Sequence, residues 1–300
     1  MRSATARAPA KINLALHVGP RGADGFHEVA TTYQAVSLDE VVTAEDADDL
    51  SVVVGGTDAD LVPTDGANLA VRAAVALAEH VGRRPGVRLV ITKQVPVAGG
   101  LAGGSADAAA ALVACDALWE TALGRVALLE IAATLGSDVP FALTGGTALG
   151  IGRGDQLTAT LVRGQSHWVL AIAERGLGTA DVYARLDRLR AGHAVPEPRV
   201  DLPVTSALAA GNQDALGRAL VNDLEPAALA LRPELRKTLS AGRDAGALGG
   251  LVSGSGPTCA FLARDAEHAL DLAVALSATG VCRTVKRVRG PVPGAQLLPG

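Results

Sequence analysis

A glycine-rich segment over residues 96–110 most directly indicates chemistry. It reads Pro96-Val-Ala-Gly-Gly-Leu-Ala-Gly-Gly-Ser105-Ala-Asp107-Ala-Ala-Ala, and a helix is expected directly behind it over Ala106–Trp119. Glycine lets the backbone turn its N–H groups inward and lets a ligand come close. The first helical turn adds unpaired N–H groups and a positive dipole end. The segment therefore predicts an anion-binding cradle with Ser105 as the helix N-cap, although an ordinary glycine-rich turn before a buried helix also fits the spacing.

Two common nucleotide-binding motifs do not fit the chain. A Walker A loop requires Gly-Lys-Ser/Thr, and the sequence contains no Gly-Lys dipeptide. A dinucleotide-binding fingerprint requires GxGxxG, and the segment 254–259 fails at its last position, which is Cys259. A second glycine-rich loop over 249–258 supplies further N–H groups and hydroxyls, although a tight hairpin explains it equally well. Two such loops favour a nucleotide-phosphate site of another kind.

Lysine is rare in this chain, which makes its positions informative. Only Lys11, Lys93, Lys237 and Lys286 are lysines among 27 basic residues. Lys11 lies inside an apolar strand pattern, where an ammonium group requires a partner. It is either a surface lysine or a point charge beside a phosphate or carboxylate. Asp138, in Leu-Gly-Ser-Asp-Val-Pro-Phe, is either a turn cap or a base that accepts a hydroxyl proton.

The elements that position these residues alternate between strands and helices. In the first half, hydrophobic periodicity predicts strands over 10–18, a strand pair over 31–46, a strand over 51–56, a helix over 68–82, a strand over 87–96, helices over 106–119 and 125–136, and a strand pair over 146–161. Asn68 is the expected start of the helix over 68–82, and Gly136 closes the helix over 125–136.

The pattern restarts around residues 160–165, which suggests a second domain. There it predicts a strand over 168–174, a helix over 179–192, two or three helices after a Pro-bearing connection, the glycine-rich turn and strand over 250–263, a helix over 265–280 and a strand over 282–290. This mixture predicts an α+β fold of two domains, residues 1–157 and 158–300, with a cleft between them.

Composition excludes several functional classes. The 300 residues are 49% hydrophobic with a net charge of −4, which excludes a disordered chain and gives no basic field for nucleic acid. The three cysteines have no CxxC spacing and are expected to be reduced thiols in a cytoplasmic protein. The longest uncharged run, Ala245–Ala263, is interrupted by glycine, serine, threonine and proline, so no membrane span is expected.

Taken together, the motifs resemble the GHMP kinase superfamily, named for galactokinase, homoserine kinase, mevalonate kinase and phosphomevalonate kinase. The resemblance spans nearly the whole chain in the order of the family. It is carried by the segments 9–14, 21–28, 96–109 (similar to PxxxGLGGGSADAA), 137–140, 222–226 and 254–258. The resemblance implies a two-domain kinase-like fold with the active site in the interdomain cleft.

Within the superfamily, the segment Gly25-Phe-His27-Glu is most similar to the branch that phosphorylates the 2-hydroxyl of 4-diphosphocytidyl-2-C-methyl-D-erythritol in the non-mevalonate isoprenoid pathway. The resemblance implies ATP and Mg²⁺ as cofactors and a small cytidyl diphosphate substrate. A homoserine or mevalonate kinase, or a non-catalytic nucleotide-binding protein, are the alternatives. Both monomer and homodimer remain open.

The resemblance also implies roles for individual residues. Asp138 is expected to be the catalytic base and to contact the substrate, with Lys11 as its partner; such a base contributes about 10²–10⁴-fold in rate. The cytidine side is expected to involve Asn13, Phe26 (where the family usually has Tyr), His27, Tyr33 and Tyr183. The implied ATP-binding residues are Pro96, Val97, Ala98, Gly99, Gly100, Leu101, Ala102 (where Gly is commoner), Gly103, Gly104, Ser105, Asn68 and Lys93. Ser105 is a candidate metal ligand.

Overall fold

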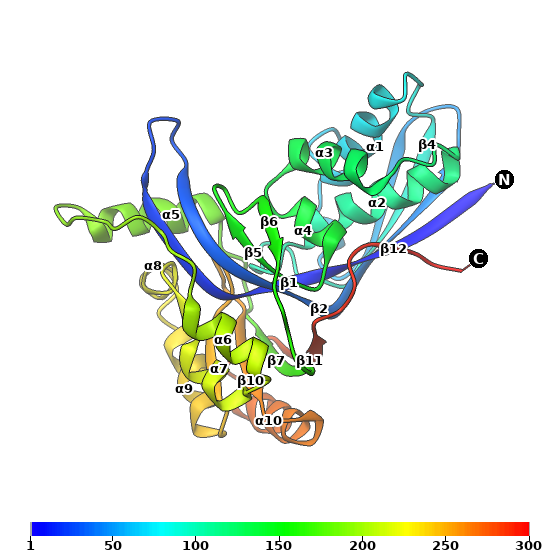
Figure 1. Ribbon diagram of the computed structural model, residues 1–300. Helices are drawn as coiled ribbons and strands as arrows, with labels where there is room; N and C mark the ends of the chain where they lie inside the picture. The colour runs from blue at the N-terminus through cyan, green and yellow to red at the C-terminus, as the bar shows by residue number, and fades with distance from the viewer. Residues whose placement is uncertain (1, 300) are drawn as a thin grey trace.

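The computed structural model describes residues 2–299, which form two β-sheets with helices packed against each (Figure 1). The first sheet has the strand order β12-β1-β2-β4-β3, and β5, β6 and β8 join it off this path. Its strands are β1 (Ser3–Arg21), β2 (His27–Asp46), β3 (Ser51–Gly56), β4 (Val87–Lys93), β5 (Thr147–Ile151), β6 (Gln156–Ala159), β8 (Val221–Asn222) and β12 (Gln296–Leu297).

A long antiparallel hairpin of β1 and β2 forms the centre of this sheet. The strand pair expected over 31–46 is wrong, because β2 runs unbroken through that region. The pairing shifts register between Pro9/Ala10, so that Pro9 faces Asp39 while Ala10 faces Val36. This irregularity absorbs the polar stretch around Ser37 as a bulge, so the strand bends without ending.

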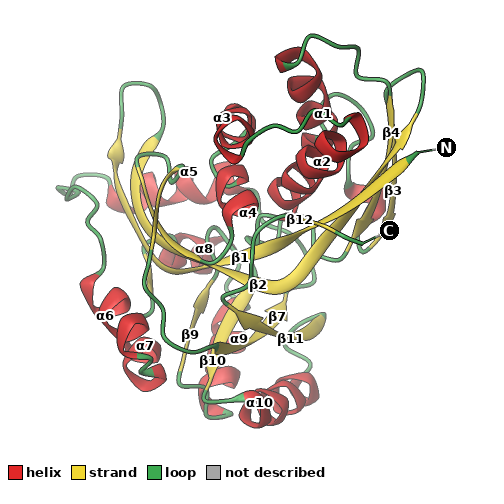
Figure 2. Ribbon diagram, turned by 45° about the vertical axis from the view of Figure 1, so that its right-hand side comes forward, coloured by secondary structure: helices red, strands yellow, loops and turns green. Residues whose placement is uncertain are grey.

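Four helices cover one face of the first sheet: α1 (Leu69–His80), α2 (Gly103–Trp119), α3 (Arg125–Leu135) and α4 (Val139–Thr144) (Figure 2). The core between them is built largely from alanine, valine and leucine. Helix α2 starts three residues earlier than expected, and its N-cap is Ala102, with φ of 58°. Ser105 as N-cap is therefore wrong. A Cβ on Gly103 would lie 3.0 Å from Glu40 and 3.1 Å from Val95, so glycine permits this early, closely packed start.

The second sheet has the order β11-β7-β10-β9. Its strands are β7 (Ser166–Ile172), β9 (Gly249–Val252), β10 (Cys259–Ala263) and β11 (Thr284–Gly290). The helices of this half are α5 (Thr179–Arg190), α6 (Leu202–Ala210), α7 (Gln213–Ala219), α8 (Glu225–Leu231), α9 (Leu235–Asp244) and α10 (Ala266–Thr279). Four helices, α6 to α9, stand where two or three were expected. Gly211 and Asn212 separate α6 from α7, Pro226 lies in the first turn of α8, and Pro233 lies between α8 and α9.

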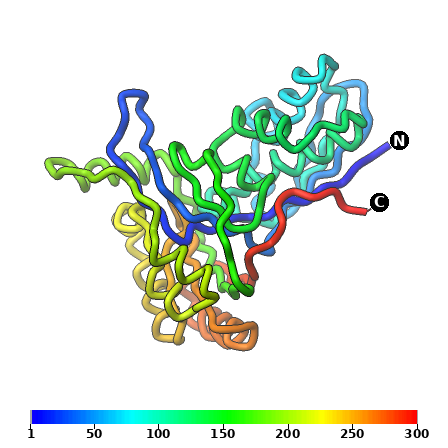
Figure 3. The backbone as a smooth tube through the Cα atoms, viewed as in Figure 1, coloured from blue at the N-terminus to red at the C-terminus, as the bar shows by residue number. Residues whose placement is uncertain are grey.

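The two halves of the chain are joined by more than their covalent connection. β12 pairs with β1, and β8 pairs with β1 in parallel, so the second half of the chain contributes strands to the first sheet. The chain ends therefore lie near each other (Figure 3). The α+β, two-domain architecture is confirmed. The boundary between residues 157 and 158 stays a prediction.

None of the helices within residues 2–299 is long and apolar enough to cross a membrane.

Candidate active site

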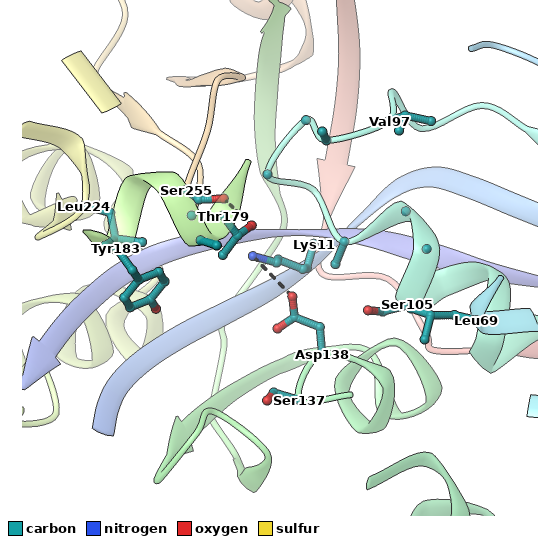
Figure 4. A pocket seen from close by; sticks show the side chains of 18 of the residues that line it. Lys11, Leu69, Val97, Ser105, Ser137, Asp138, Thr179, Tyr183, Leu224 and Ser255 are labelled. Atoms are coloured by element: carbon teal, nitrogen blue, oxygen red, sulfur yellow. Dashed lines mark hydrogen bonds and ion pairs between the residues drawn. The ribbon is translucent and has the colours of Figure 1, made fainter. Parts of the chain in front are cut away.

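A cavity of about 860 Å³ lies between the β1–β2 hairpin, the start of α2 and the start of α5. Of the residues expected to form the site, Leu101 is buried beneath the cavity, only 1% exposed. The others line it: Lys11, Asn13, Phe26, His27, Tyr33, Asn68, Lys93, Pro96–Gly100, Ala102–Ser105, Asp138 and Tyr183. Figure 4 shows several of them facing a common space. The fold thus brings together residues that lie up to 172 positions apart in the sequence.

The glycine-rich loop between β4 and α2 turns its carbonyl groups away from the cavity. Four consecutive carbonyls accept hydrogen bonds from other parts of the protein. The bonds are Leu177 N to Ala98 O (3.2 Å), Thr258 N to Gly99 O (3.3 Å), Ser253 Oγ to Gly100 O (3.1 Å) and Lys11 N to Leu101 O (3.1 Å). Most of these donors belong to the second half of the chain, so that half holds the outer side of the loop.

The N–H groups of the same loop are correspondingly free. For the N–H groups from Ala98 to Ser105, no acceptor is found within the part of the chain that the structure describes. Gly100 adopts φ of +76°, and a Cβ there would lie 2.2 Å from the Ser253 carbonyl, so this close turn requires glycine. A row of unpaired N–H groups that continues into the start of a 17-residue helix suits a polyphosphate anion.

Asp138 and Lys11 face each other beside this loop. Lys11 Nζ lies 3.8 Å from Asp138 Oδ2, and Lys11 is buried in the middle of β1 (Figure 4). Asp138 occupies the N-cap position of α4, yet its side chain makes no capping hydrogen bond. The Asp138 side chain therefore does not act as a turn cap. The Asp138 carboxylate instead points toward the Lys11 ammonium.

A buried hydrogen-bonded chain fixes the position of the Lys11 ammonium. Lys11 Nζ donates to Asn13 Oδ1 (2.6 Å), Asn13 Nδ2 donates to Thr31 Oγ1 (2.8 Å), and Thr31 Oγ1 donates to the Ala15 carbonyl (2.7 Å). Because these side chains are on the paired strands β1 and β2, the sheet itself sets their spacing. Lys11 is thus a buried, partnered cation rather than a surface lysine.

Tyr33, expected on the cytidine side, lies beside Lys11 at the same end of the cavity. Its ring stacks on Phe141 at 4.8 Å, and the Lys11 ammonium lies 5.6 Å from the ring centroid. Burial, together with the nearby Asp138 carboxylate, raises the pKa of Tyr33 well above its ordinary value. Its phenol therefore stays neutral and can donate a hydrogen bond.

The other end of the cavity is lined by aromatic rings. His27 Nε2 lies 2.7 Å from Asp187 Oδ1, and the His27 and Tyr183 rings lie 5.1 Å apart. The Phe26 ring is 55% exposed, and the Arg153 guanidinium lies 3.9 Å from its centroid. This end can hold a flat ring between aromatic and polar walls.

Sequence reasoning missed Asp187 and Arg153. Tyr183 and Asp187 are four residues apart on α5, with Thr179 four residues earlier, so one helix face carries all three. This four-residue spacing could have indicated from the sequence that Asp187 lies on the same helix face as Tyr183. Arg153 is in the turn between β5 and β6, where it also contacts Asp24 at 2.9 Å, and no local pattern marks it.

Lys93 and Asn68 line the cavity, but both side chains are engaged by the protein. Lys93 Nζ lies between two buried carboxylates, in contact with Glu40 Oε1 and 2.6 Å from Asp107 Oδ2. Asn68 caps α1, since its Oδ1 accepts from Ala70 N at 2.9 Å. Burial and the Glu40 charge raise the pKa of Asp107 to about 7. Asp107 Oδ1 has no partner among residues 2–299.

The oxygen groups near the loop are few. No cluster of three or more His, Cys, Asp or Glu side chains suited to a metal ion is found among the described residues. Ser105, in the first turn of α2, and the Asp138 carboxylate line the cavity on either side of the space in front of the loop (Figure 4). Mg²⁺ is commonly bound through one or two protein oxygens together with substrate phosphates, so this sparse set fits it.

Comparison with known proteins places this site in a family. The model for the GHMP kinases N terminal domain matches residues 68–146, and that for the GHMP kinases C terminal domain matches residues 204–282. A 4-diphosphocytidyl-2-C-methyl-D-erythritol kinase of Mycolicibacterium gilvum is 56% identical over 99% of this chain and 93% of its own length. One of Streptomyces coelicolor is 56% identical over 99% of each chain.

Solved structures agree with the sequence relatives. A crystal structure of 4-(cytidine 5'-diphospho)-2C-methyl-D-erythritol kinase is 32% identical, has a TM-score of 0.76 and covers 99% of this chain and 100% of its own. A homoserine kinase from Cytophaga hutchinsonii has a TM-score of 0.78 at 20% identity over 99% of this chain and 98% of its own, which shows a shared fold. The chain is therefore a GHMP kinase and belongs to the 4-diphosphocytidyl-2-C-methyl-D-erythritol kinase family.

Proposed function

We infer that the protein transfers the γ-phosphoryl group of ATP to the 2-hydroxyl of 4-diphosphocytidyl-2-C-methyl-D-erythritol, giving the 2-phosphate and ADP. The full-length identity of 54–56% to curated kinases of this name supports the substrate. The observation that carries the chemistry is the Lys11–Asp138 pair, which faces the row of free amides across one cavity. A carboxylate that caps nothing and lies beside a fixed ammonium suits proton abstraction from an alcohol.

The roles that we propose follow from charge and position. Asp138 accepts the proton of the tertiary hydroxyl as that oxygen attacks the γ-phosphorus and the bond to the β-phosphate oxygen breaks. The Lys11 ammonium stabilises both the ionised carboxylate and the negative charge that develops on the reacting oxygens. The amides of the glycine-rich loop hold the phosphate chain in line with the acceptor.

The aromatic end of the cavity is proposed to bind the cytosine ring. His27 is oriented by its bond to Asp187, and the rings of Phe26 and Tyr183 supply apolar surface in the same part of the cavity. Burial raises the pKa of Tyr183 to about 12, so its ring stays uncharged against a neutral base. Asn13, expected on the cytidine side, lies between this end and Lys11. Because its amide already bonds Lys11 and Thr31, it is proposed to shape the wall beside the erythritol portion.

ATP is proposed to bind along the loop from Pro96 to Ser105. Asn68 and Lys93 contribute the shape of the adjoining wall, because their polar atoms already have protein partners. Ser105, which lines the cavity at the start of α2, would hold Mg²⁺ together with the phosphates. When bound, the ion would neutralise phosphate charge.

The substrate assignment is tested by ADP release. Turnover is expected with the cytidyl erythritol substrate and not with homoserine or mevalonate; activity only on the latter two would overturn the assignment. Asp138→Asn is expected to keep ATP affinity within a few-fold while turnover falls by about 10²-fold or more. Asp271→Asn, on the exposed face of α10, is the matched control. Near-normal turnover of Asp138→Asn would contradict its role as the base.

A further inference from the structure

An ion pair between Asp58 and Arg283 joins the two halves of the molecule behind the glycine-rich loop. Asp58 follows β3 of the first sheet, and Arg283 precedes β11 of the second. Arg283 Nη1 lies 2.7 Å from Asp58 Oδ1, and Arg283 Nη2 lies 3.1 Å from Asp58 Oδ2. Two parallel bonds of this kind fix orientation as well as distance.

The same carboxylate also holds the start of the glycine-rich loop. Asp58 Oδ2 accepts a hydrogen bond from Val97 N at 3.2 Å. Asp58 adopts a left-handed conformation with φ of 56°, which is uncommon for a residue other than glycine and indicates that surrounding contacts hold it. The hydrogen bond from the Arg283 guanidinium is the main cause that keeps the pKa of Asp58 below its ordinary value, so the carboxylate is ionised at neutral pH.

Arg283 is in turn fixed to the second sheet. Its backbone N–H donates to the Ile172 carbonyl of β7 at 2.8 Å. A continuous connection therefore runs from β7 through Arg283 and Asp58 to Val97. It spans 225 residues of sequence between the two charged partners.

Donors from the second half of the chain hold the loop carbonyls from Ala98 onward, whereas Asp58 holds the Val97 N–H at the start of the loop. A cavity of about 230 Å³ lies behind it, lined by Pro96, Val97, Gly99 and Arg283 among others. Because side chains do not fill that space, packing alone does not fix the first residues of the loop. The carboxylate of Asp58 does so through a hydrogen bond.

We propose that Asp58 and Arg283 are positioning residues for ATP, which tie the start of the phosphate-binding loop to the second sheet. This rests on the proposed function. Neither residue contacts the Lys11–Asp138 pair or the aromatic end of the cavity. Loss of the Asp58–Arg283 ion pair is therefore expected to weaken ATP binding and to leave binding of the cytidyl substrate unaffected.

A purely structural role predicts a different result. The Arg283 side chain is 32% exposed, and partly exposed ion pairs contribute little to global stability. If the pair served only overall stability, both substrates would be affected alike. The split between the two substrates therefore separates the two roles.

The test measures ATP binding directly by calorimetry, without acceptor, and KM for each substrate by ADP release. Arg283→Gln and Asp58→Asn are each expected to raise the Kd and KM for ATP about tenfold, with KM for the cytidyl substrate within twofold. Asp58→Ala is expected to have a larger effect, because it also removes the acceptor of Val97 N. The double variant Asp58→Asn/Arg283→Gln is expected to match the single variants, because both remove the same tie.

Arg7→Gln is the matched control, since Arg7 pairs with Asp39 at 3.3 Å away from the loop, and it is expected to behave as wild type. Unchanged ATP affinity in Arg283→Gln would overturn the proposal. Equal weakening of binding for both substrates would also overturn it, as would a hundredfold loss of ATP affinity in the double variant. Because ATP binding is measured without acceptor, an error in the acceptor assignment would leave this result unaffected.

Discussion

Asp107→Asn is expected to change how the stability of the protein depends on pH. Asp107 is 3% exposed and shares the Lys93 ammonium with Glu40, so two buried carboxylates face one buried cation. Burial, reinforced by the Glu40 charge, raises the pKa of Asp107 to about 7 from an ordinary 3.8. The folded state therefore retains a proton that the unfolded chain releases. Between the unfolded-state pKa of 3.8 and the folded-state pKa of about 7, rising pH lowers the free energy of unfolding.

The size of the effect follows from the same values. A difference of one pKa unit corresponds to about 1.4 kcal/mol, so ionised Asp107 destabilises the fold by at most about 4 kcal/mol above pH 7. The penalty is absent below about pH 4, because both states are then protonated. Asparagine cannot ionise, so the variant does not incur it.

Urea denaturation of both proteins from pH 5 to pH 8 measures this difference. The free energy of unfolding of Asp107→Asn relative to wild type is expected to rise by about 1.4 kcal/mol for each pH unit up to about pH 7 and then to level off. Asp271→Asn, on the exposed face of α10, makes the same chemical change and is expected to show no such slope. Parallel curves for Asp107→Asn and wild type would refute the reasoning.

Four further substitutions test the site. Lys11→Met is expected to lower turnover by about 10²-fold with ATP affinity nearly unchanged. Single-turnover kinetics separate the chemical step from binding. A normal chemical step with weakened ATP binding would contradict this role for Lys11. His27→Ala is expected to weaken binding of the cytidyl substrate far more than binding of ATP. Asp187→Asn is expected to have a smaller effect of the same kind. Equal weakening of binding for both substrates would show that this end of the cavity does not bind the base. Gly104→Ala is expected to keep the melting temperature, since a Cβ there would meet Leu69 Cδ1 at an ordinary 3.5 Å. It is expected to raise the Kd for ATP about tenfold, because Gly104 lines the cavity at the start of α2. Unchanged ATP affinity would place the phosphates away from α2.

Local patterns predicted much of the framework. Asn68 caps α1, and Gly136 ends α3 as expected, because capping chemistry depends on neighbouring residues alone. The glycine-rich segment was also located correctly between a strand and a helix. The first residue of α2 was not predicted, because the early start depends on the close packing of Gly103 against Glu40 and Val95, which local sequence does not reveal.

Features that depend on distant partners could not be predicted. The bulge opposite Pro9 keeps β2 continuous through a segment whose polar residues look like a turn. The pairings of Asp58 with Arg283 and of His27 with Asp187 join residues 225 and 160 positions apart. Single-sequence periodicity contains no information on such pairs, whereas the family motifs placed Lys11 and Asp138 near each other without any geometry.

Under the proposed function, the β1–β2 hairpin also sets the length of the substrate that the cavity accepts. Tyr33, beside the reacting groups, and His27, at the aromatic end, are both on β2 and are separated by six residues, so the strand between them spans at most about 20 Å. An insertion of one residue there would lengthen this span by about 3.4 Å and would turn every following side chain to the opposite face of the sheet. Under the proposed roles of His27 and Asp138, the separation between the nucleobase and the acceptor hydroxyl is set by a single extended strand, which can change only in whole-residue steps.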